Sequence, residues 1–229
     1  MSAHGHTDNN RGSLLARGIA DPRKGVRVGW ALLKGYWYRF YCRIRGIRFS
    51  AGGNFQLHGR LDVRGPGEVV FGDNVLVHGL TTPHTYAAGA RIVVGDNVIM
   101  DAVRFGCVRE ILIGRDCLLA TVAIMDTDFH STRADRRSGS APVRVAPVRL
   151  ADNVWVGGNA GILPGTTIGE NSVVGFGAVC MRDFPANVII LGNPAKVAAP
   201  IPSSQQAEPA KDSGSPTAAP SAPGAERRT

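Results

Sequence analysis

The sequence predicts an all-β protein whose main domain is a parallel β-helix of hexapeptide repeats. A large apolar residue recurs at every sixth position of one stretch without a gap: Leu150, Val156, Ile162, Ile168, Val174 and Cys180. A second, mostly small residue follows each of them after four positions: Val154, Ala160, Thr166, Ser172, Ala178 and Phe184. The composition agrees, because 29 glycines and only 7% aromatic residues favour tight turns and a core of small aliphatic side chains.

Each repeat is expected to form one side of a triangular coil of about 18 residues. Each side is then a short strand that points one large and one small side chain inward. Glycine and Asp-Asn pairs tolerate positive φ and are expected to turn the corners. The same pattern occurs upstream, where Phe71, Val94 and Ile113 each begin such a turn. It predicts further core positions: Leu57, Val63, Val69, Val77, Met100, Leu119 and Met125.

Composition divides the chain into four zones. Residues 1–22 are polar and expected to be flexible, and residues 23–49 are expected to form a basic amphipathic helix. Residues 50–198 form the predicted β-helix domain, which a loop at 131–149 interrupts. Residues 199–229 are rich in Pro, Ala and Ser and are expected to be disordered, because they cannot bury enough apolar surface.

The predicted helix has apolar residues spaced by three or four: Val26, Trp30, Leu33, Trp37, Phe40 and Ile44. Basic residues fall mainly off this stripe, and no acidic residue occurs between Asp21 and Asp62. Such a helix suits peripheral contact with an anionic membrane through residues 23–48. The alternative is a helix that packs on the main domain or across a subunit contact while its arginines are solvated. The sequence leaves both interpretations open.

The net charge of +8 and the pI of about 9.9 favour an anionic partner such as an acidic membrane surface or a phosphorylated cofactor. Nucleic acid is not expected, because no recognised reader motif is present. The cysteines are spread without a zinc or disulfide pattern and are predicted to be reduced core residues: Cys42, Cys107, Cys117 and Cys180. The chain shows no signal-peptide pattern and no long apolar run, so a cytoplasmic location is expected, with the inner membrane face as a site of peripheral contact.

One interruption of the repeat carries the predicted chemistry. After Met125 the six-residue register returns only at Leu150, and excursions of this length in compact domains are usually functional or disordered. His130 lies at the root of the excursion, beside the regular scaffold. Histidine side chains ordinarily change charge near neutral pH, which suits general base catalysis.

Three segments together resemble a known family. They are Ile124-Met-Asp-Thr-Asp-Phe-His130, the run from Pro147 that contains Asn-Val-Trp155-Val-Gly-Gly158, and Gly192-Asn-Pro-Ala-Lys196. This combination strongly resembles the sugar O-acetyltransferases of the hexapeptide-repeat superfamily, which include maltose, galactoside and surface-polysaccharide acetyltransferases. The resemblance covers about residues 50 to 198 and implies a left-handed β-helix.

The resemblance implies acetyl transfer from acetyl-CoA to a hydroxyl of a sugar or surface-polysaccharide precursor, by a homotrimer. His130, sixteen residues after Gly114 of an Ile-Gly turn, matches the family's catalytic base. The backbone N–H of Gly158 matches the family's oxyanion donor. Asp101 matches a polar acceptor contact of the family. Because side chains of an extended segment alternate, Asp126, Asp128 and His130 are expected to share one face. There Asp128 orients the imidazole or either aspartate contacts the acceptor; the alternative for each aspartate is solvation in the loop.

The resemblance also implies a binding groove for coenzyme A between neighbouring subunits. The positions that match it are Gly158, Ala160, Phe176, Gly177, Arg182 and Lys196. Arg182 and Lys196 would contact phosphates. Phe176 departs from the small residue common at its position. No metal is expected.

Three alternatives remain at the level of sequence. The acceptor is a serine hydroxyl or an amino sugar instead of a sugar hydroxyl. A γ-type carbonic anhydrase uses the same β-helix, but it needs three histidines around zinc. The candidates here are His78, His84 and His130, and the expected pair of histidines five residues apart is missing. A non-catalytic β-helix scaffold is the third alternative.

Overall fold

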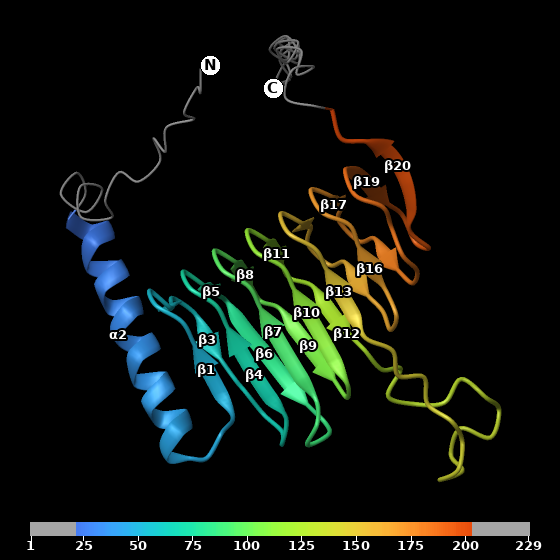
Figure 1. Ribbon diagram of the computed structural model, residues 1–229, viewed down its shortest axis with the longest axis horizontal. Helices are drawn as coiled ribbons and strands as arrows, with labels where there is room; N and C mark the ends of the chain where they lie inside the picture. Colours follow the sequence, from blue (N-terminus) through green and yellow to red (C-terminus); the bar gives the residue numbers. More distant parts are fainter. Residues whose placement is uncertain (1–21, 203–229) are drawn as a thin grey trace, which may run out of the picture.

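The computed structural model describes residues 22–202, which form one helix followed by a solenoid of stacked coils (Figure 1). The predicted all-β solenoid is confirmed. Residues 1–21 and 203–229, which hold most of the segments expected to be flexible, lie outside the described residues. The left-handed winding stays a prediction from the resemblance.

Three sheets form the three sides of the solenoid, and their strands are parallel except for β20 at the C-terminal end. The first contains β1 (Phe49–Ala51), β4 (Glu68–Phe71), β7 (Arg91–Val94), β10 (Glu110–Ile113), β13 (Val148–Leu150) and β16 (Thr167–Ile168). The second contains β2 (Gln56–Leu57), β5 (Leu76–His78), β8 (Ile99–Asp101), β11 (Leu118–Ala120), β14 (Trp155–Val156), β17 (Val173–Val174), β19 (Val188–Leu191) and β20 (Lys196–Pro200). The third contains β3 (Arg60–Leu61), β6 (Leu80–Thr85), β9 (Arg104–Cys107), β12 (Ala123–Met125), β15 (Gly161–Ile162) and β18 (Val179–Cys180).

The repeat predicts the core of the regular coils well. All twelve expected inward positions between Leu150 and Phe184 are buried. In the most regular coil Leu150 pairs with Ile168, eighteen residues later, as expected for three six-residue sides. Met125 is a correction, because it is half-exposed and Ile124 is fully buried in its place. The corner before β12 has one residue fewer than the repeat predicts, so the inward position moves back by one.

Asparagines form a ladder along the corner between the first and second sheets. Asn54, Asn74, Asn97, Asn153 and Asn171 all have φ between 53° and 58°. The side-chain amide of each of the first two donates to the asparagine of the next coil, at 2.9 and 3.0 Å. The same bond joins Asn153 to Asn171 at 2.9 Å. Asparagine tolerates the left-handed region, and its amide carries both a donor and an acceptor, so it stabilises the corner and the stacking together.

The glycines before these corners have a different role from the predicted one. Gly72 and Gly95 are not among the positive-φ glycines. A Cβ on Gly95 would lie 2.8 Å from the carbonyl carbon of Gly114 in the next coil. These glycines are therefore required by the close approach of successive coils.

Helix α2 (Pro22–Ile44) covers the N-terminal end of the solenoid (Figure 1). It ends five residues before the predicted boundary, because Gly46 adopts φ 66° and the N–H of Ile47 donates to the carbonyl of Cys42 at 2.9 Å. Its contact face consists of small residues and one tyrosine. Ala31 and Cys42 are buried, and the Tyr38 hydroxyl accepts a hydrogen bond from the N–H of Val63 at 3.1 Å.

The predicted apolar stripe of the helix does not make this contact. Trp30, Trp37 and Phe40 are 64%, 59% and 50% exposed. The helix does pack on the main domain, as one interpretation expected, but through its opposite face. Within residues 22–202, no helix is long and apolar enough to cross a membrane.

The folded region extends past the predicted boundary at residue 198. Strand β20 pairs antiparallel with β19, and the N–H of Ile201 donates to the carbonyl of Asn187 at 2.8 Å. This strand covers the last coil on the second sheet, at the end of the solenoid opposite to α2 (Figure 1).

Replacing Asn97 tests the corner ladder. Asn97→Ala places an L side chain at φ 58° and removes hydrogen bonds to Asn74 and Asp116, so the free energy of unfolding should fall by about 2 kcal/mol. Asn97→Gly relieves the backbone cost and should lose roughly half as much. Urea unfolding at matched protein concentration measures both, and an equal loss in the two variants would contradict the role of positive φ.

Candidate active site

The excursion leaves the solenoid where β12 ends, and its root forms a short pair of antiparallel segments (Figure 1). Thr127 bridges Val145, and the N–H of Ala146 donates to the carbonyl of Asp126 at 2.9 Å. Strand β13 begins at Val148, and Leu150 pairs with Ile113 of the preceding coil, so the six-residue register returns at Leu150 as predicted. The root is therefore tied to the scaffold on both strands.

Asp126 has a structural role and is a correction to the predicted site. Its side chain is fully buried, and its carboxylate accepts hydrogen bonds from the backbone N–H groups of Val108, Arg109 and Glu110 at 2.6–2.7 Å. These bonds fix the neighbouring corner of the preceding coil. A carboxylate committed in this way is not available to an acceptor.

Phe129 turns the chain at the root. Its φ of 59° is uncommon for a bulky residue, and its ring packs edge-on against Tyr86 with a centroid separation of 4.9 Å. The ring also covers Gly106, whose added Cβ would lie 2.6 Å from Phe129 Cζ. The packing of the ring holds the uncommon backbone in place.

His130 is exposed directly after this turn. Its backbone N–H donates to the Asp128 carbonyl at 2.7 Å, while its imidazole has no hydrogen-bond or ion-pair partner among residues 22–202. The expected common face of Asp126, Asp128 and His130 does not form, because the segment is not extended. Asp128 is half-exposed and makes no side-chain hydrogen bond to the imidazole.

Gly158, Phe176 and Gly177, which were predicted to line the donor groove, lie at the corner between the second and third sheets. The carbonyl of Gly158 accepts the N–H of Gly177 at 2.9 Å, while the N–H of Gly158 has no acceptor in the described part of the chain. A Cβ on Gly177, where φ is 69°, would meet nothing within 4 Å. Phe176 is 76% exposed and lies over Gly158. These residues leave an open edge with a free backbone donor.

Of the other predicted cofactor and acceptor residues, one is buried and three are exposed. Ala160 is buried in the core, so its side chain cannot line a groove. Arg182 and Lys196 are exposed near the C-terminal end, with the Arg182 guanidinium 5.7 Å from the ring centre of Phe184. Asp101 is exposed at the end of β8, on the same corner as Gly158 but nearer the N-terminal end.

The third sheet separates His130 from Gly158. Gly158 precedes β15, while the excursion follows β12, and these strands pair with Ala123 opposite Gly161. The two features therefore lie at opposite ends of neighbouring strands in one sheet. At 3.3 Å per residue, the two ends are about 15 Å apart.

The histidines of the carbonic-anhydrase alternative do not converge. His78 stacks on His58 with ring centres 4.7 Å apart, whereas His84 lies at the other end of β6, 3.6 Å from a carboxylate oxygen of Asp62. Within residues 22–202, no three His, Cys, Asp or Glu side chains form a group that can hold a metal.

The buried cysteines have the character expected of core residues. Burial, and then the neighbouring Asp126 carboxylate, raises the pKa of the Cys107 thiol to about 12. Burial raises the pKa of Cys180 to about 12 and that of Cys117 to about 11. These thiols are protonated at neutral pH and unsuited to nucleophilic attack.

Sequence reasoning missed Tyr86, Gly106 and Phe129 as residues that position the root. The available signal was Gly106, a glycine inside an apolar strand pattern, which often marks close approach of another group. The contact joins segments from three coils, so spacing alone did not identify it.

Comparison with known proteins agrees with this architecture. The family model described as bacterial transferase hexapeptide (six repeats) matches residues 147–182. This stretch of the chain is therefore similar to the hexapeptide-repeat transferases. A Saccharomyces cerevisiae protein whose name places it among acetyltransferases is 37% identical over 116 residues, which are 48% of this chain. The match spans 56% of that relative, so little more than half of its length is represented.

A second relative is matched over a longer region. Escherichia coli WbbJ, named for O-acetyl transfer in lipopolysaccharide biosynthesis, is 29% identical over 170 residues, which are 69% of this chain and 76% of WbbJ. Among solved structures, Bacillus cereus AntD, an N-acyltransferase bound to dTDP-4-amino-4,6-dideoxyglucose and coenzyme A, has a TM-score of 0.59 at 17% identity. That match covers 71% of this chain and 90% of AntD, and it shows that the two share a fold.

Replacing Gly106 by alanine tests how the root is positioned. The added methyl would displace the Phe129 ring, so amide hydrogen exchange of residues 128–131 should accelerate roughly tenfold or more while the solenoid stays protected. Gly161→Ala is the matched control in the same sheet, since its Cβ would lie 4.0 Å from Val179. Equal exchange in the two variants would contradict the assigned role of Phe129.

Proposed function

We propose that this protein is an acetyl-CoA-dependent O-acetyltransferase that acetylates a hydroxyl of a sugar or surface-polysaccharide precursor. The observation that carries the proposal is the exposed His130 imidazole, which has no partner among residues 22–202 and lies on a root fixed by Asp126 and Phe129. The sugar O-acetylation named for WbbJ supports the choice of acceptor.

His130 is the general base in this proposal. A ring nitrogen takes the proton of the acceptor hydroxyl as its oxygen attacks the thioester carbonyl. When the C–S bond then breaks, the same proton passes to the departing coenzyme A thiolate. A base of this kind contributes roughly 10²–10⁴-fold to the rate. Asp101 and Asp128 remain the candidates for acceptor contact, since Asp126 is buried. The orientation of the imidazole then depends on the bound acceptor or on a neighbouring subunit.

The open corner at Gly158 and Gly177 suits coenzyme A. The thioester supplies an activated acetyl group when it is bound. The free N–H of Gly158 would donate to the carbonyl oxygen on which negative charge develops. The open space at Gly177 allows close approach of the pantetheine arm, and Arg182 and Lys196 offer positive charge to the phosphates.

The separation of the two features supports a site shared by two protomers. His130 and Gly158 lie at opposite edges of the third sheet, so they cannot both contact one thioester within a protomer. We infer that His130 of one protomer faces Gly158 of the next in a homotrimer. The inference is supported by an exposed apolar ridge on the second sheet, where Ile99, Leu118 and Trp155 stack in register on adjacent strands.

His130→Ala should lower kcat by roughly 10²–10⁴-fold while the fold and the oligomeric mass remain unchanged. Thiol release from acetyl-CoA, measured with paired sugars that carry a hydroxyl or an amine at one position, gives the rate and the acceptor class. His58→Ala is the matched control, because this histidine lies on the first coils, remote from the excursion. Near-normal turnover of His130→Ala would reject the assignment.

A further inference from the structure

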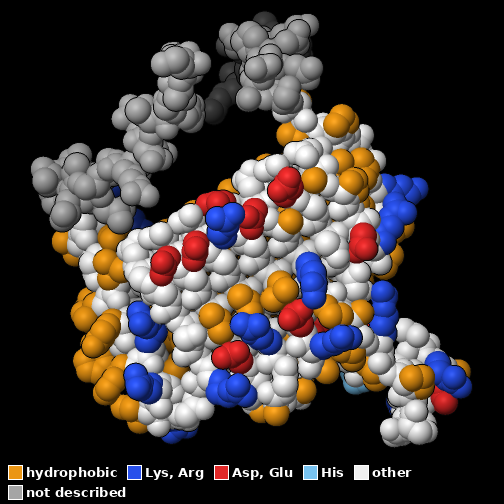
Figure 2. Space-filling model, in the orientation of Figure 1, with side chains coloured by type: hydrophobic (Ala, Val, Ile, Leu, Met, Phe, Trp, Pro, Cys, Tyr) orange, Lys and Arg blue, Asp and Glu red, His pale blue; other side chains and the backbone are white. Residues whose placement is uncertain are grey.

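The outer face of α2 is apolar and aromatic, and nothing in the described residues covers it. The exposed side chains run the length of the helix: Val26, Trp30, Leu33, Tyr36, Trp37, Phe40, Tyr41 and Ile44. Figure 2 shows these hydrophobic side chains gathered along the α2 end of the molecule, with Lys and Arg among them. Exposed patches of this kind mark interaction surfaces.

Helix geometry places this face directly away from the solenoid. At 3.6 residues per turn, the buried Ala31 and Cys42 and the close contact of Gly35 with Phe55 define one side of the helix. Leu33 and Phe40 project from the opposite side. The apolar face is therefore an outer face of the structure that residues 22–202 form, and no coil of the solenoid lies over it.

Basic residues flank the apolar face on both sides. Arg27 and Lys34 follow one flank, and Arg39 and Arg43 follow the other. The helix contains no acidic residue. Lys34 donates to the Gly59 carbonyl at 2.8 Å, which fixes the helix on the first coil.

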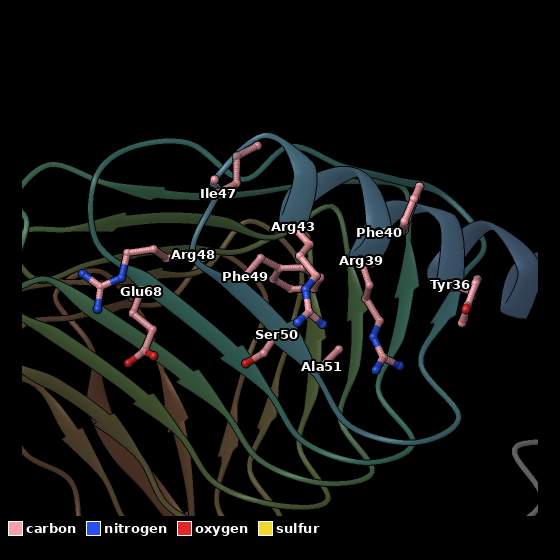
Figure 3. Close-up of a pocket in the computed structure, with 11 residues that line it drawn as sticks. Tyr36, Arg39, Phe40, Arg43, Ile47, Arg48, Phe49, Ser50, Ala51 and Glu68 are labelled. Atoms are coloured by element: carbon pink, nitrogen blue, oxygen red, sulfur yellow. The ribbon is translucent and has the colours of Figure 1, made fainter.

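One flank opens into a groove of about 630 Å³ between α2 and the first strands (Figure 3). Arg39, Arg43 and Arg48 line it, together with the apolar rings of Phe40 and Phe49. The guanidinium groups of Arg39 and Arg48 make only long hydrogen bonds to carbonyls, at 3.3 and 3.4 Å, and that of Arg43 has no polar partner among residues 22–202. The acidic residue of the groove, Glu68, is already paired with Arg91 at 3.4 Å.

We propose that α2 docks this protein on an anionic phospholipid bilayer, with its aromatic face among the acyl chains and the groove arginines on a lipid phosphate. The positive charge that flanks the apolar face favours an anionic bilayer over other occupants. Guanidinium groups bind phosphate through several donors at once, and interfacial helices carry aromatic residues on one face and basic residues beside it. In the proposed arrangement α2 lies in the plane of the interface, as amphipathic interfacial helices do.

A second copy of the chain is a poorer occupant of this face. A twofold contact between two α2 helices would bring their basic flanks together, and neither helix offers an acidic residue. An anionic bilayer instead satisfies the apolar face and both flanks.

Flotation of the full-length protein with vesicles tests the proposal. The protein should float with an equal mixture of phosphatidylcholine and phosphatidylglycerol, should remain unbound with phosphatidylcholine alone, and should dissociate as salt is raised. Failure to bind the anionic vesicles, or equal binding to both kinds, would overturn the proposal.

Two sets of substitutions locate the contact. Arg39→Ala with Arg43→Ala and Arg48→Ala should weaken binding roughly a hundredfold, from about fivefold for each charge near the surface. Trp30→Ser with Trp37→Ser and Phe40→Ser should abolish it, and because these side chains are exposed the fold should survive. Three exposed arginines far from α2 supply the charge-matched control: Arg109, Arg136 and Arg137, each replaced by alanine. A control that loses as much binding as the groove variant would reject the assignment to this surface.

Tryptophan fluorescence gives a readout independent of binding assays. The chain has three tryptophans, so Trp155→Phe leaves Trp30 and Trp37 on α2 as the reporters. Their emission should shift to the blue on anionic vesicles and should be quenched by lipids brominated in the acyl chain. Unchanged emission would contradict insertion. Dissociation of an oligomer by the aromatic variant, without vesicles, would assign the face to a second copy instead.

Discussion

The backbone at the corner between the first and second sheets constrains the rest of the molecule. Most coils turn there through an asparagine in the left-handed region and one turns through Asp116, and side-chain hydrogen bonds join these residues in neighbouring coils. Because corners stack, each strand lies directly over its counterpart and the inward side chains form one continuous column. A scaffold fixed in this way permits one long excursion, between β12 and β13, while the coils on either side remain in register. The exposed His130 depends on that rigidity.

The regular part of this structure was predictable from spacing, since an uninterrupted six-residue period determines which side chains point inward. Prediction failed where the period itself changes. Because the corner before β12 is one residue short, Ile124 points inward where Met125 was predicted. Because the root is not extended, Asp126 and His130 do not lie on one face. Burial of Asp126 depends on contacts with the preceding coil, which no local pattern encodes. The apolar stripe of α2 was visible in the sequence, but its orientation depends on the opposite face of small residues, where Ala31 is buried and Gly35 meets Phe55.

The molecule separates its proposed tasks along the axis of the solenoid. Helix α2 occupies one end with its basic and aromatic face, the excursion leaves from the middle, and Arg182 and Lys196 lie toward the other end (Figure 1). A parallel trimer would place all three α2 helices at the same end, so docking on a bilayer would be multivalent. In that arrangement an acceptor carried near the membrane surface would approach the sites from the end at which Asp101 is exposed.

The turnover of a mixture of two inactive variants tests the claim that the active site lies between protomers. His130→Ala removes the base, and Gly177→Trp fills the donor groove, so each homotrimer should be inactive. Co-refolded equal mixtures contain trimers in which an intact His130 of one protomer faces an intact groove of the next, and they should recover about a quarter of wild-type turnover. If base and groove belonged to one protomer, every site would carry a defect, and the mixture would remain inactive.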